Sequence, residues 1–600
     1  MANATSPGAA EGMSFTGNLT LAESISQWPA AIWNNRDFLL LEARIVGSAM
    51  ACIYVSSQAA LRRPPSARLP KKKKGKHGKK SDESSEDEYV QGLLLSDAIM
   101  FPILAGMMLV GLYYLIKWLE DPAILNKILG VYFSVMSLAS MGKLFSDGLQ
   151  LIFSMVFPEV WRAHDGSLLH FDNHKRSQYR ISESGEHIYE AEIQSPLPGN
   201  YLSKMKQPGL SSSLWVFRLI MQEQWKVNFT FLPFVEESFH VKFLDILGVV
   251  LAVVANIIYH TTNSVMLSNI MGYAFSYAGI IMMSPTTFTT GSCVLFGLFF
   301  YDIYMVFYTS VLANPFIKHT ITDTHSSPYM VTVATKLDVP IKLVFEGPQK
   351  ASMLGLGDIV VPGMFVGLCL RFDHFLYYHR QKKQVSIDLK TTDGNSGQVV
   401  TSTQTQPMIV RPDYVNPKSQ WGNWFWTTGL GRFFWQSTNA TTPALKAANF
   451  PKTYFHAAMT GYLLGMMVTL MMLLVFKHAQ PALLYLVPGV VFAVWITGLF
   501  RGELHEMWIY TEDGTLDKED IVVEVDGDGN VIKKAEDAHE TKEAGTKALE
   551  KASSDKTAEK EDATAAEGEE PEPTTVFAFT IQAPASLSRR RTRRAKQHTE

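Results

Sequence analysis

Two aspartates lie inside long apolar runs, where a carboxyl group is costly unless it has a function. Asp302 is flanked by apolar and aromatic residues in the segment FFYDIY, residues 299–304. Asp358 lies in the segment MLGLGDIVVPG, residues 353–363. Neither has a basic neighbour within one helical turn that could neutralise it, so both are candidate functional residues.

Two such carboxyl groups on consecutive membrane spans can face each other if the spans pack side by side. Gly355 and Gly357 remove side-chain bulk beside Asp358, which allows close helix approach and local unwinding. Carboxyl groups in contact cannot both ionise, so one keeps a proton while the other acts as a base. Such a pair can activate water and protonate a departing amine, which is aspartic peptide hydrolysis. It can equally hold a cation in a transporter or channel, and these residues alone leave both hypotheses open.

A third element is the segment HAQPALLYLVP, residues 478–488, in which Pro481 stands at the head of an apolar run. A proline there starts or kinks a helix and frees a backbone carbonyl. Within a membrane this arrangement needs another group to satisfy the carbonyl, or a cavity that the carbonyl lines.

Other ionisable residues in apolar runs have simpler explanations. Asp97 and Asp245 lie near the ends of their runs, where a carboxylate reaches the headgroup layer. Asp147 lies deeper, but Lys143 one turn earlier could neutralise it.

Apolar runs of about 20 residues, enough to cross a bilayer as helices, must position these groups. They predict an all-α polytopic membrane protein with about nine transmembrane helices and with disordered cytosolic loops and tail. The predicted spans are 38–61, then 97–118 and 125–157 (together 97–157), 243–260 and 264–283 (together 243–283), 290–312 and 353–371 with a lumenal loop between them (together 290–371), and 454–476 and 482–500 (together 454–500).

The polar segments predict the orientation of the chain. The lysine-rich loop 62–96 lies between two spans, which marks the cytosolic side rather than a nuclear signal. The segment 1–37 is then lumenal, and Asn3 and Asn18 are candidate N-glycosylation sites. The polar loop 158–240, the insertion 373–451 and the tail 501–600 are expected in the cytosol, the tail being largely disordered.

Several site types are not expected. The cysteines, Cys52, Cys293 and Cys369, all lie in apolar runs and suit small buried residues better than a disulfide or zinc framework. The acidic turn 526–530 lacks the glycine and the final glutamate of a calcium loop. We expect no metal, no cofactor and no nucleic-acid partner. An aromatic cluster in the insertion is expected to anchor at the headgroup layer; its members are Trp421, Trp424, Trp426 and Trp435.

Together and in this order, the motifs resemble the presenilin and signal peptide peptidase family of intramembrane aspartyl proteases. The matching residues are Tyr301 with Asp302, Gly355-Leu356-Gly357-Asp358, and Pro481-Ala482-Leu483. The longer stretches 340–345, 354–363 and 476–488, two of which contain these motifs, look closest to the signal peptide peptidase branch. The resemblance covers residues 38–508 in outline.

The resemblance implies a role for each motif. Asp302 and Asp358 would be the catalytic pair. Pro481, Ala482 and Leu483 would shape the active site and contact substrate, as would the residues beside the aspartates, which are Tyr301, Gly355, Leu356 and Gly357. Segment 340–345 could pair as an edge strand with an unwound substrate.

Three functions compete at this point. The favoured one is an endopeptidase of the endoplasmic reticulum membrane, which cuts type II oriented helical segments such as remnant signal peptides, and also tail-anchored or regulatory membrane proteins. The second is a transporter or channel with a cation between Asp302 and Asp358, although the two halves of the chain show no convincing repeat. The third is a non-proteolytic quality-control scaffold. Homo-oligomers or quality-control partners are compatible with the first and third.

Overall fold

The computed structural model describes residues 36–67, 92–118, 122–163, 166–173, 175–182, 186–190, 195–198, 208–231, 235–262, 264–304, 342–347, 351–392, 399–410, 414–427, 443–476, 481–512 and 577–582. The sequons at Asn3 and Asn18, most of the predicted lumenal loop and nearly all of the predicted disordered tail lie outside these residues.

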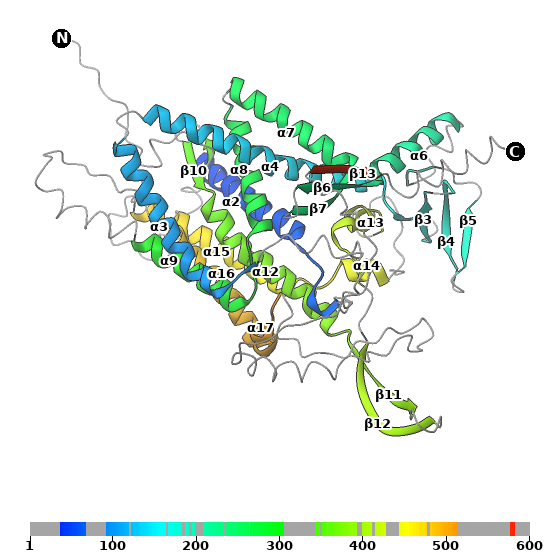
Figure 1. Cartoon of the computed structure of the whole chain (residues 1–600). Coiled ribbons are helices and arrows are strands. Elements are labelled where there is room, and N and C mark those ends of the chain that lie inside the picture. The colour runs from blue at the N-terminus through cyan, green and yellow to red at the C-terminus, as the bar shows by residue number, and fades with distance from the viewer. Residues whose placement is uncertain are drawn as a thin grey trace, which may run out of the picture.

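Long apolar helices dominate the described structure (Figure 1). Eight of them are long and apolar enough to cross a membrane, and a shorter apolar helix of 16 residues, α9, lies among them. With α9, the described helices match the nine predicted spans and confirm a polytopic helical membrane protein. In chain order they are α2 (Arg36–Ala59), α3 (Leu95–Trp118), α4 (Pro122–Val156), α7 (Phe243–Thr262), α8 (Val265–Met282), α9 (Phe288–Ile303), α12 (Gly357–His379), α15 (Thr453–Phe476) and α16 (Leu483–Arg501).

Helix α12 is the centre of the bundle. It packs against α2, α8, α9, α15 and α16, and 17 of its 23 residues are buried. In α7 the buried residues are Leu244, Gly248 and Ala252, and most of its apolar side chains face outward. An apolar run does not distinguish these two environments, because lipid and protein interior are both apolar.

The seventh span differs from its prediction at both ends. Residues Ala351–Gly355 form strand β10, paired with β9 (Lys342–Glu346), so the helix begins at Gly357 rather than 353. It also continues past Arg371 to His379 because the charges there are paired inside the protein. Arg371 forms an ion pair with Glu512, and Asp373 accepts hydrogen bonds from the amides of Tyr454 (3.1 Å) and Phe455 (2.9 Å).

The polar loop 158–240 was expected to be disordered, and this prediction is wrong for its described residues. Four antiparallel strands are followed by helix α6 (Pro208–Gln222) and a hairpin. A strand from the tail, β13 (Phe577–Gln582), pairs with the hairpin on the β6 side (Figure 1). The strands are β2 (Val160–Arg162), β3 (Leu168–Asp172), β4 (Ser177–Ile181), β5 (His187–Glu190), β6 (Gln224–Phe231) and β7 (Val235–Lys242). Alternating polar and apolar residues let these short strands form without a long apolar run.

The insertion 373–451 also contains regular structure. A long hairpin, β11 (Lys383–Thr392) with β12 (Val399–Val410), extends away from the bundle (Figure 1). The remaining short elements are η1 (Pro65–Ala67), β1 (Gly92–Leu93) paired with β8 (Ser284–Pro285), η4 (Lys418–Gln420), α13 (Trp421–Thr427), α14 (Pro443–Ala448) and α17 (Leu504–Ile509).

Helix α13 carries three of the four clustered tryptophans and packs against the end of α4. The indole of Trp426 donates to the carbonyl of Met155 at 2.7 Å, and the ring of Trp421 meets Tyr54 edge-on. These two side chains therefore serve protein packing, and the headgroup role stays a prediction. Of the cysteines, Cys369 is buried and Cys52 half-buried, but Cys293 is exposed on α9, contrary to expectation.

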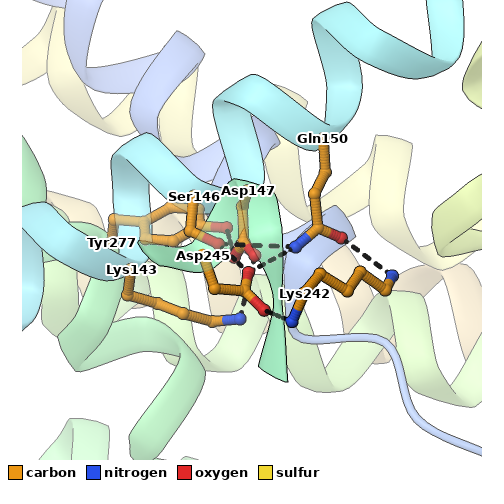
Figure 2. A network of polar contacts seen from close by, with 7 residues as sticks. All are labelled: Lys143, Ser146, Asp147, Gln150, Lys242, Asp245 and Tyr277. Carbon is orange, nitrogen blue, oxygen red and sulfur yellow. Dashed lines mark hydrogen bonds and ion pairs between the residues drawn. The ribbon is translucent and has the colours of Figure 1, made fainter. Parts of the chain in front are cut away.

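Two of the other aspartates join three helices through the polar network of Figure 2. Asp147 of α4 accepts from Lys143 Nζ at 2.9 Å, as the spacing predicts, and from the hydroxyl of Tyr277 on α8 at 2.5 Å. Asp245 of α7 accepts from the side chains of Ser146 and Gln150 on α4. Asp245 is thus part of the helix packing rather than merely interfacial, which corrects the simpler expectation.

Tyr277→Phe is expected to lower the free energy of unfolding by about 1.5–3 kcal/mol, the range for hydrogen bonds to charged groups. The change removes one hydroxyl that links α8 to α4 and leaves the ring in place. The shift of the thermal midpoint in detergent measures the loss. Tyr132→Phe, at an exposed tyrosine of α4, is the matched control. Equal midpoints for both variants would show that this bond does not hold the helices together.

Candidate active site

Asp302 lies in the last turn of α9 and is 7% exposed. Its Oδ2 accepts a hydrogen bond from the backbone amide of Leu483 at 3.4 Å. Leu483 is the first residue of α16, and the amides at a helix N-terminus favour a negatively charged partner. Two of the three motifs thus meet through a direct contact.

Asp358 lies in the first turn of α12, directly after strand β10, and is half-buried. Its carboxyl group is close enough to that of Asp302 for the two to interact electrostatically. The hydroxyl of Tyr462 on α15 donates to the backbone carbonyl of Asp358 at 3.4 Å. Four helices therefore position the pair: α9 and α12 carry the carboxyl groups, the first amide of α16 contacts Asp302, and α15 contacts the backbone of α12.

The glycines beside Asp358 have a different effect from the one expected. A Cβ at Gly357 would have no neighbour within 4 Å among the described atoms, and one at Gly355 would lie 3.5 Å from Asp358 Oδ2. None of the described helices approaches closely enough at Gly357 to require a glycine there. Both residues are exposed, so the missing side chains leave the approach to the Asp358 carboxyl group open.

The other predicted site residues divide between the core and the surroundings of the pair. Leu356 packs toward α8, where a Cβ at Gly272 would lie 3.3 Å from Leu356 Cδ2. Tyr301 is half-buried against the core. Pro481 is buried, and its own carbonyl accepts from the amide of Leu484 at 3.2 Å in the first turn of α16. The carbonyl that the proline would leave free, four residues earlier at Lys477, lies outside the described residues.

Strand β9 covers most of the segment 340–345 that was expected to pair with a substrate. Asn269 of α8 holds it by two bonds: Asn269 Nδ2 donates to the carbonyl of Val344 at 2.8 Å, and the Val344 amide donates to Asn269 Oδ1 at 2.9 Å. Both backbone groups of Val344 therefore point away from β10. This edge of β9 is occupied by Asn269, which makes it a poor place for a further strand.

The opposite edge of the hairpin belongs to β10. Val344 lies opposite Met353, so the pairs that exchange hydrogen bonds are Leu343 with Leu354 and Phe345 with Ser352. The amide and carbonyl of Met353 must then point away from β9. The Met353 side chain is 60% exposed and lies five residues before Asp358, so this edge leads directly to the carboxyl pair.

Sequence reasoning missed Asn269 and Tyr462. The signal in the sequence is a charged side chain within a span, and both residues are uncharged. A polar amide within an apolar helix was the available signal for Asn269, because such groups usually find a partner within the membrane. Nothing in the sequence distinguishes Tyr462 from the other span tyrosines.

Comparisons with known proteins identify a matching family and several relatives. Residues 84–514 match the family model described as signal peptide peptidase. The signal peptide peptidase of Mus musculus is 26% identical over 449 residues, which cover 72% of this chain and 77% of the relative. The human signal peptide peptidase is also 26% identical, covering 70% of this chain and 74% of the relative. A probable intramembrane protease of Schizosaccharomyces pombe is 33% identical over 43% of this chain and 61% of its own length.

The bundle and the match define a multi-pass intramembrane protease. The chain belongs to the signal peptide peptidase family. Its substrates are accordingly helical segments within the bilayer, and the transporter hypothesis is not favoured.

Proposed function

We propose that the chain is an aspartic endopeptidase in which Asp302 and Asp358 form the catalytic pair. The observation that carries the proposal is their convergence: α9 and α12 pack together with their carboxyl groups within range of electrostatic interaction, and the α16 amide of Leu483 donates to Asp302. The pair holds one proton. Its ionised member takes a proton from water, which attacks the peptide carbonyl, and its protonated member supplies a proton toward the departing amine.

The residues around the pair have supporting roles in this proposal. Leu483 positions Asp302 through its backbone, with Pro481 and Ala482 directing the start of α16. Gly355 and Gly357 leave room for the substrate beside Asp358. Tyr301 and Leu356 position their neighbouring aspartates from the core.

The substrate is proposed to bind as an added strand on the exposed edge of β10. A peptide bond within a helix is inaccessible to a catalytic pair, because its carbonyl and amide are engaged in the helix. Pairing with Met353 offers the unwound chain replacement hydrogen bonds within the membrane, where an unpaired backbone group costs several kcal/mol, about 4 or more. The two hydrogen bonds between Asn269 and Val344 hold β9 in register beside β10.

The proposed substrates are type II oriented spans, including remnant signal peptides, in the endoplasmic reticulum membrane. The names of the mouse and human relatives support the class. The orientation follows from a lumenal N-terminus and the lysine-rich loop 62–96 on the cytosolic side. Tail-anchored or regulatory substrates, homo-oligomers and quality-control partners stay predictions.

Cleavage of a type II signal-peptide substrate by detergent-purified protein tests the proposal. Release of two fragments by the wild type supports it. Ion flux through proteoliposomes, lost on Asp302→Asn and without any cleavage, would replace it with a cation pathway.

The orientation predicts that Asn3 and Asn18 are glycosylated in cells. Removal of N-glycans should increase the gel mobility of the wild type, and Asn3→Gln combined with Asn18→Gln should abolish that shift. Asn228 also lies in an acceptor sequon, Asn228-Phe229-Thr230, but in β6 of the proposed cytosolic region. Asn228→Gln is therefore the control and should leave the shift unchanged. A shift that depended on Asn228 alone would reverse the proposed orientation.

A further inference from the structure

Helix α6 presents an apolar face that the described part of the protein covers only in part. Among its side chains, Leu210 is 43% exposed, Val216 38%, Phe217 43% and Ile220 45%. At 100° per residue they lie on one side of the helix, with Ser213 between them. The only charged residue in the helix, Arg218, lies on the opposite side. A helix exposed to water on this face would ordinarily carry charged residues there.

The opposite face of α6 is firmly attached to the sheet β2–β5. Arg218 is 1% exposed and donates to the carbonyls of Pro158 (2.8 Å) and Pro196 (3.1 Å), while its guanidinium lies 4.4 Å from the ring centre of Phe171. Trp215 is 3% exposed and meets the same ring edge-on. The orientation of the helix is therefore set by its buried face, and the apolar face is held outward.

The apolar face of α6 continues the lipid-facing surface of two spans. Phe217 packs against Phe153 and Phe157 at the end of α4, with ring centres 6.3 and 6.0 Å apart. Helix α6 also contacts α7 and lies beyond the end at which α7 begins (Figure 1). Exposed apolar side chains occupy these ends of both spans, among them Ile152 on α4 and Ile246 on α7, 59% and 54% exposed.

We propose that α6 is an in-plane membrane helix whose Leu210, Val216, Phe217 and Ile220 insert into the lipid layer beside the ends of α4 and α7. The occupant of this face is lipid, because the face is continuous with the exposed apolar surface of two membrane-spanning helices. An amphipathic helix of this kind buries its apolar side at the boundary between headgroups and acyl chains. The membrane then supports the sheet β2–β5 through α6.

A spin label at position 213 tests the proposal. Ser213 lies at the centre of the exposed face and makes only a local contact, to the carbonyl of Gly209. Ser213→Cys is made in a chain with Cys52→Ala and Cys293→Ala, because Cys369 is fully buried and does not label. The protein is placed in phosphatidylcholine nanodiscs at one chain per disc, and cleavage of a substrate confirms that each variant is folded.

The accessibility of each spin label to oxygen, which partitions into lipid, is compared with its accessibility to a water-soluble nickel chelate. A label at Ile246→Cys on α7 is the reference for a position in lipid. A label at Glu186→Cys, at an exposed position before β5, is the reference for a position in water. The label at 213 is expected to resemble that at 246, with an oxygen-to-nickel ratio several-fold above that at 186. A ratio equal to that at 186 would overturn the proposal. So would low accessibility to both reagents, because protein would then cover the face.

Discussion

Asp358→Asn is expected to reduce cleavage of a type II signal-peptide substrate by about a thousandfold or more, and Asp302→Asn by a similar factor. General acid–base steps each contribute about 10²–10⁴ in rate. An amide at either position can neither accept the proton of the attacking water nor release one to the leaving amine. The two losses should not add in the double variant, because the carboxyl groups act as a unit. Initial cleavage rates in detergent measure all three variants.

The matched control is Asp97→Asn, a half-buried aspartate near the start of α3 whose carboxylate accepts from the amide of Leu94. This variant should cleave at a rate close to that of the wild type. Undiminished cleavage by Asp358→Asn, with Asp97→Asn also active, would mean that the carboxyl pair is not the catalytic centre. Thermal midpoints of the variants separate a chemical loss from unfolding.

Met353→Pro is expected to lower cleavage by about tenfold to a hundredfold with little change in stability. Proline removes the amide that points outward from β10, and proline is tolerated on a strand edge where the amide has no partner within the sheet. The substrate strand would lose one backbone hydrogen bond and leave a carbonyl unpaired, a penalty of about 1–3 kcal/mol. The internal bonds of the β9–β10 hairpin are retained.

Met353→Ala is the control for the side chain, and it should retain most of the activity if the backbone amide is what matters. Val344→Pro is the opposite case, since it removes the amide bonded to Asn269 and should lower the thermal midpoint as well as cleavage. If Met353→Pro cleaved like the wild type, the substrate would not pair along β10. The assignment of the carboxyl pair would be unaffected.

Much of the membrane architecture follows from sequence, because lipid demands long apolar runs with satisfied backbones. All nine predicted spans correspond to helices of the bundle. The predicted span boundaries are wrong where a residue interacts with a partner distant in sequence that stabilises a different local structure. Arg371 and Asp373 suggested the end of a span, yet Glu512 and the start of α15 pair with them and the helix continues. The apolar residues of segment 351–355 predict part of a membrane span, yet the segment forms strand β10 and pairs with β9.

The polar regions were less predictable for a related reason. Short strands in loop 158–240 lack a long apolar pattern, and their stability depends on neighbours such as Arg218, which is bound by carbonyls 22 and 60 residues away. An uncharged side chain such as Asn269 gains significance only when its partner is known. Its two bonds to Val344 decide which edge of the hairpin remains available.

The sequence alone establishes a polytopic membrane protein with two unneutralised aspartates on consecutive spans, because an isolated carboxyl group in an apolar run has few explanations other than function. The tertiary structure is needed to see that α12 lies at the centre, that the first amide of α16 reaches Asp302, that Asn269 occupies the outer edge of β9, and that α6 turns an apolar face outward. Each of these depends on contacts between segments far apart in the chain, and such contacts leave no local pattern in the sequence.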